Sequence, residues 1–119
     1  MIEFNYVKRY GVPDIPVLYV ALKIGNKRIG GPALLDTGFD GGVYPNQILS
    51  EFLASTSPKK KEILEDTSGE VECDILELES EVFHPESDFR KSIGKVQIYL
   101  PTKDENLTED VVVGREGRY

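Results

Sequence analysis

The sequence predicts a small all-β domain, either a barrel or a sandwich of short strands, with one short helix. Several short segments rich in β-branched and aromatic residues are separated by glycine, proline or polar turns. Only residues 45–54 carry apolar side chains at helical spacing. A length of 119 residues with 39% hydrophobic and 29% charged residues suits one folded domain, residues 1–119.

The first half of the chain contains most of the predicted strands and the helix. The extended segments are expected, in order, over residues 1–10, 16–24, 27–29, 34–36 and 43–44. Gly25-Asn26 predicts a hairpin turn, and Gly30-Gly31-Pro32 predicts a bend before the fourth segment. The helix is expected over residues 45–54, with Pro45 at its start, and is followed by a polar loop over residues 55–61.

The second half is dominated by a predicted hairpin. Residues 62–66 and 70–78 alternate apolar with acidic side chains around a tip formed by Thr67, Ser68 and Gly69. Outward-facing acids protect such a ribbon from edge-to-edge pairing. The remaining elements are predicted in order as an irregular stretch over 79–89, a turn over 92–95, a strand over 96–100, a loop over 103–106 and a short buried strand over 111–115.

Composition excludes several classes of function. The net charge is −7, which argues against nucleic acid and against an anionic membrane surface as partners. No apolar run approaches the roughly 20 residues of a transmembrane helix, and the N-terminus lacks a signal pattern, so we expect a cytoplasmic protein. The single cysteine, Cys73, cannot form an internal disulfide and is expected to be a small buried residue.

The most informative stretch is residues 33–44, ALLDTGFDGGVY. An apolar run ends at Asp36, and Thr37-Gly38 and a glycine-rich turn follow. This pattern delivers a carboxylate from the end of a core strand onto a tight loop, as a preorganised catalytic group requires. The alternative is an ordinary turn, because Asp and Thr bond their own backbone and Gly accepts positive φ.

Elimination leaves carboxylate chemistry. The only histidine, His84, has no recognisable nucleophile partner, and the chain lacks the residues for a His/Cys metal cluster or a phosphate-binding glycine loop with lysine. We therefore expect no metal and no cofactor. The alternative is a carboxylate-only magnesium or calcium site, which 21 acidic residues would allow, but no loop has calcium-ligand spacing. Peptide hydrolysis by acids alone needs two carboxyls that share a proton. The chain offers one such motif, so a second carboxyl would come from a second copy across a two-fold axis.

Two motifs and their order resemble a known family. Leu34-Leu35-Asp36-Thr37-Gly38, the hairpin around Gly69, and Val112-Val113-Gly114-Arg115 look like the active-site loop, flap and C-terminal strand of retropepsin-like, single-domain aspartic proteases. The resemblance covers roughly residues 17–116. It implies a small closed barrel with a flap hairpin, active as a homodimer, that cleaves peptides or unfolded proteins.

The resemblance also implies roles for individual residues. Asp36 would be the catalytic carboxylate, Thr37 would bond its symmetry mate, and Gly38 would let backbone approach the carboxyl. Gly114 implies close packing, and Arg115 would pair with Asp40. Thr67, Ser68 and Gly69 would form the flap tip. The dimer would use the N-terminal segment, residues 2–10, or another surface. The alternatives are an inactive peptide-binding or dimerisation module of the same fold, and an unrelated acidic β-domain.

Overall fold

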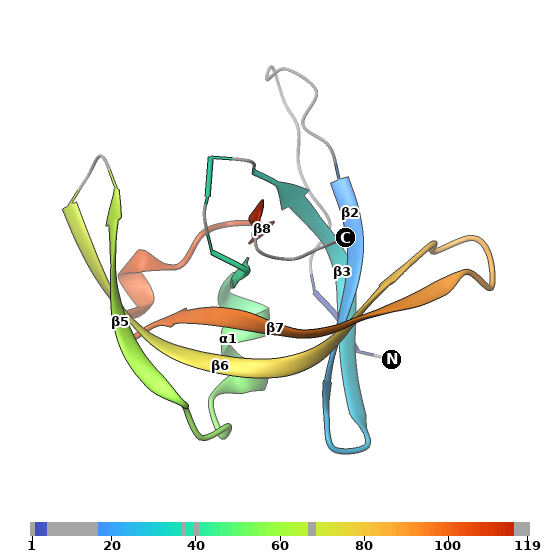
Figure 1. Ribbon diagram of the computed structural model, residues 1–119, viewed down its shortest axis with the longest axis horizontal. Coiled ribbons are helices and arrows are strands. Elements are labelled where there is room, and N and C mark those ends of the chain that lie inside the picture. Colours follow the sequence, from blue (N-terminus) through green and yellow to red (C-terminus); the bar gives the residue numbers. More distant parts are fainter. Residues whose placement is uncertain (1, 5–16, 37, 40, 67–68, 116–119) are drawn as a thin grey trace.

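A computed structural model describes residues 2–4, 17–36, 38–39, 41–66 and 69–115. These residues form a mainly β structure whose core is a closed six-stranded barrel (Figure 1). Around the barrel the strands follow the order β3-β2-β6-β7-β4-β8, and pairing of β8 with β3 closes it. The strands are β1 (Ile2–Glu3), β2 (Val17–Ile24), β3 (Lys27–Leu35), β4 (Val43–Tyr44), β5 (Lys60–Asp66), β6 (Gly69–Phe83), β7 (Arg90–Pro101) and β8 (Val111–Val113).

The predicted bend at Gly30-Gly31-Pro32 is wrong, because β3 runs through it without interruption. On one edge β3 pairs with β2 from Lys27 to Leu34, and on the other it pairs first with β1 and then with β8. Gly31 and Pro32 fall between those two partners, so the missing N–H of Pro32 removes no ladder bond on that edge. A side chain at Gly31 would collide with the ring of Phe4, whose Cδ1 would lie 2.7 Å from the added Cβ.

Strand β6 belongs to two structures at once. Its first half pairs with β5 and forms the predicted acidic hairpin, which is confirmed, although β5 begins at Lys60 rather than Glu62. Its second half pairs with β2 as part of the barrel. The predicted irregular stretch over 79–89 is confirmed only for residues 84–89, and the predicted turn over 92–95 is wrong, because β6 and β7 remain paired to Phe83 and Arg90 across a bulge at Ser80/Glu81. The two ends of β6 project on opposite sides of the barrel (Figure 1).

The predicted helix is confirmed as α1 (Gln47–Leu53), but it begins at Gln47 rather than at Pro45. The side chain of Asn46 accepts a hydrogen bond from the Leu49 amide at 3.0 Å and caps the helix. The loop expected at 103–106 contains a 3-10 turn, η1 (Asp104–Asn106). No helix in the described ranges is long and apolar enough to cross a membrane.

The barrel encloses one apolar core, and a smaller cluster lies beneath the β5–β6 hairpin. The main core contains buried side chains from all six barrel strands and from α1. The smaller cluster is formed by Val71, Cys73, Ile75 and Tyr99, with Phe39, Tyr44 and Leu64 packed against it. Cys73 is fully buried, as predicted, and burial raises the pKa of its thiol to about 11, with the nearby Asp74, Glu62 and Glu72 carboxylates adding to the shift.

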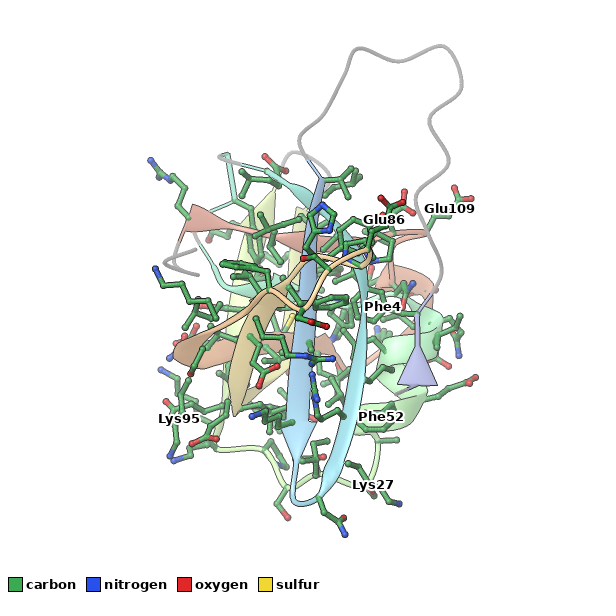
Figure 2. All side chains as sticks on the ribbon, turned by 90° about the vertical axis from the view of Figure 1, so that its right-hand side faces the viewer. Phe4, Lys27, Phe52, Glu86, Lys95 and Glu109 are labelled. Carbon is green, nitrogen blue, oxygen red and sulfur yellow. The ribbon has the colours of Figure 1, made fainter. Side chains whose placement is uncertain are left out.

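A basic cluster surrounds one carboxylate on the outside of the barrel. Glu81 on β6 accepts ion pairs from Lys23 at 2.7 Å, Arg28 at 2.9 Å and Arg90 at 3.4 Å. The Glu81 side chain is only 12% exposed, so the three cations neutralise a largely buried charge. In Figure 2, Lys27 lies at the tip of the β2–β3 hairpin and Glu86 lies toward the other end of the molecule.

Candidate active site

The site is built where β3 ends and β8 passes beneath the following loop. Strand β8 lies between β3 and β4. It pairs parallel with β3 and antiparallel with β4. The described part of the connection from β3 to β4, residues 36, 38–39 and 41–42, therefore lies across the end of β8. The Asp36 amide donates to the carbonyl of Val113 at 2.9 Å, so the carboxylate-bearing residue is held at this crossing.

Gly114 allows this crossing to be close. Its amide donates to the Gly42 carbonyl at 2.7 Å, and the amide of Arg115 donates to the Phe39 carbonyl at 3.0 Å. A Cβ at Gly114 would collide with the carbonyl oxygens of Phe39 and Gly41 and would lie 2.7 Å from Phe39 Cδ2. The two sequence motifs, separated by more than seventy residues in the chain, therefore share one hydrogen-bonded crossing.

Asp36 lies exposed at the surface of this crossing. Its Oδ1 accepts a hydrogen bond from the Gly38 amide at 2.9 Å, and the Phe39 amide donates to the Asp36 carbonyl at 3.1 Å. This local turn holds both the backbone and the side chain of Asp36. A Cβ at Gly38 would lie 3.2 Å from Asp36 Oδ1, so glycine leaves the space that the carboxylate occupies.

A cavity of about 620 Å³ opens beside Asp36. The cavity is lined by residues of the β3–β4 connection, the β5–β6 hairpin, η1 and β8. The hairpin and the connection therefore both border the cavity. In Figure 1 this hairpin rises at the left, beside the loop that follows β3. The apolar part of the lining consists of Phe39, Tyr44, Leu64, Val71 and Val112. The cavity therefore offers apolar surface next to the Asp36 carboxylate.

Phe39 is the site residue that the sequence analysis missed. Its ring makes edge-to-face contacts with Tyr44 and Tyr99, at centroid distances of 6.2 and 5.7 Å. Tyr44 in turn donates a hydrogen bond to the Asn106 carbonyl at 2.5 Å. Phe39 thus packs the β3–β4 connection against Tyr44 and Tyr99, in the cluster beneath the β5–β6 hairpin. A large apolar residue inside an otherwise polar and glycine-rich loop was the available signal.

Several predicted site residues lie outside the described ranges: Thr37, Asp40, Thr67 and Ser68. The expected bond between Thr37 residues and the expected Arg115–Asp40 ion pair therefore stay predictions. Gly69, the described residue of the predicted tip, begins β6 with φ +132°. Val43, Ile75 and Ile98 are buried in the core.

His84 lies away from this cavity, exposed in the β6–β7 turn, where its Nδ1 accepts from the Glu86 amide at 3.1 Å. Within the described ranges, no group of three or more His, Cys, Asp or Glu side chains is arranged to hold a metal ion. No protein-family model matches the chain. No curated protein is significantly similar to it in sequence.

Proposed function

We propose that this chain is a retropepsin-like aspartic endopeptidase whose active form is a homodimer. The observation that carries the proposal is the crossing of the two motifs, with Asp36 bonded to the Val113 carbonyl and Gly114 packed beneath the loop. The cavity between this loop and the β5–β6 hairpin supports it, because a peptide needs both an apolar pocket and a covering element at the reacting bond.

One carboxylate cannot supply both acid and base. At an isologous two-fold axis, Asp36 of one protomer would meet Asp36 of its partner, and the two carboxyls would share one proton. The ionised carboxyl removes a proton from water, whose oxygen bonds to the scissile carbonyl carbon, while the other carboxyl donates its proton to the carbonyl oxygen. The resulting diol collapses as the protonated carboxyl transfers its proton to the leaving nitrogen, the C–N bond breaks, and the ionised carboxyl takes the proton of one diol hydroxyl, whose oxygen becomes the carbonyl of the product acid. The pair is then left with one proton again.

The test is cleavage of an unfolded protein across pH 3–7 by the wild type, Asp36→Asn and Asp88→Asn. Asp88 is a matched control, because it is an exposed aspartate in the β6–β7 turn. We expect the wild type and Asp88→Asn to cleave equally, and Asp36→Asn to lose at least about a thousandfold in rate while remaining folded and dimeric. Sedimentation measures the oligomeric state in parallel.

Other outcomes separate the alternatives. A dimer that cleaves nothing in any variant, yet binds peptides, would identify the inactive binding module. Equal cleavage by all three proteins would mean that Asp36 is a turn residue. A wild type that stays monomeric at high concentration would contradict the shared-proton mechanism, since Asp36 would then have no partner carboxyl.

A further inference from the structure

The rim of the cavity carries uncompensated negative charge. Glu65 on β5 and Glu105 on η1 border it on different walls, and both are exposed. The described lining contains no lysine, arginine or histidine. Within the described residues, neither Glu65 nor Glu105 makes an ion pair or a side-chain hydrogen bond. A bound peptide therefore meets apolar walls and two acidic groups at the edge.

Along the described part of the β5–β6 hairpin, acidic side chains are paired with lysines at the base and lack such partners next to the tip. At its base the acids are neutralised: Lys61 lies opposite Asp74 and bonds it at 3.4 Å, and Lys60 bonds Glu62 at 2.9 Å. Next to the tip, Glu65 lies directly opposite Glu70. Like charges directly opposite on neighbouring strands are destabilising. The acids near the cavity are thus arranged at a cost to the hairpin that a cationic ligand would relieve.

We propose that the site prefers peptides in which an apolar residue is flanked by lysine or arginine. This inference rests on the proposed function of the cavity as a peptide site. In an extended peptide, successive side chains point to opposite sides at about 3.3 Å per residue. An apolar side chain directed at Leu64, Val71 and Val112 leaves its neighbours directed outward, toward the rim where Glu65 and Glu105 lie.

The experiment measures binding of three labelled peptides to the Asp36→Asn protein by fluorescence anisotropy. The peptides carry a central leucine flanked by lysine, by glutamine or by glutamate. The test variant adds Glu65→Gln and Glu105→Gln, and the control variant instead adds Glu86→Gln and Asp88→Asn. Both changes remove two negative charges, but Glu86 and Asp88 lie in the exposed β6–β7 turn, on the opposite side of the barrel from the hairpin (Figures 1 and 2).

We expect the lysine-flanked peptide to bind about threefold to tenfold more tightly than the glutamine-flanked one at low salt, and the glutamate-flanked one to bind most weakly. The test variant should lose this preference and the control variant should keep it. An equal loss in both variants would assign the preference to net charge, and a preference that survives in both would show that Glu65 and Glu105 do not cause it. Either result would overturn the inference.

Cleavage of all three peptides by the protein with Asp36 intact is measured alongside. Cleavage without any dependence on the flanking residue would overturn the charge preference and leave the protease proposal standing. Neither binding nor cleavage of any of the three peptides would overturn both.

Discussion

Replacing Gly114 with alanine tests the crossing of β8 beneath the loop over residues 36–42. The added Cβ would collide with the carbonyl oxygens of Phe39 and Gly41, which belong to the backbone and cannot rotate away. The loop or the end of β8 must therefore shift. That shift would also disturb the Gly114–Gly42 and Arg115–Phe39 backbone hydrogen bonds, at 2.7 and 3.0 Å.

The expected loss of stability follows from these two effects. Overpacking of a closely packed site costs about 1–3 kcal/mol. Two weakened backbone hydrogen bonds contribute about 1 kcal/mol each. Gly114→Ala should therefore lower the free energy of unfolding by roughly 3–5 kcal/mol, a large share of the roughly 5–15 kcal/mol typical of a domain. Urea denaturation followed by circular dichroism measures this as a lower midpoint with an unchanged slope.

Gly25→Ala is the matched control. Gly25 lies in the β2–β3 turn at φ +59°, and a Cβ there would have no atom within 4 Å. Its cost should come from the left-handed backbone alone, about 1 kcal/mol. If Gly114→Ala costs no more than Gly25→Ala, the close approach of β8 to the loop is refuted. That result would also contradict the crossing of the two motifs on which the candidate site rests.

Two further predictions concern groups outside the site. Glu81→Gln should lower the free energy of unfolding by about 1–3 kcal/mol, because three cations lose their shared carboxylate. The exposed Glu79→Gln on the same strand should change it by less than about 0.5 kcal/mol in the same urea titration, and equal losses would contradict the role of Glu81. The raised pKa of Cys73, about 11 against 9.0, means that the folded state keeps a proton that the unfolded state releases, so this contribution is complete below pH 9 and is lost as pH rises to 11. Wild type should lose about 2–3 kcal/mol more than Cys73→Ala between those values, and parallel pH profiles would contradict this.

Local sequence pattern was sufficient for several elements. The acidic alternation on either side of residues 67–69 predicted the β5–β6 hairpin, because a buried face and a turn together specify its register. The apolar spacing within residues 47–53 predicted α1. The run ending at Asp36 predicted a carboxylate at the end of a buried strand. In each case the residues that determine the structure are neighbours in the chain.

The tertiary structure decided what depends on distant partners. The need for glycine at position 31 in β3 comes from the ring of Phe4, and the length of β6 depends on pairing with β2 and β7. The role of Phe39 exists only because Tyr44 and Tyr99 meet it under the hairpin. By itself the sequence determined the position of α1, of the β5–β6 hairpin and of the strand that ends before Asp36. Only the fold determined that β8 crosses beneath Asp36, because strand pairing joins segments whose separation in the chain carries no local signal.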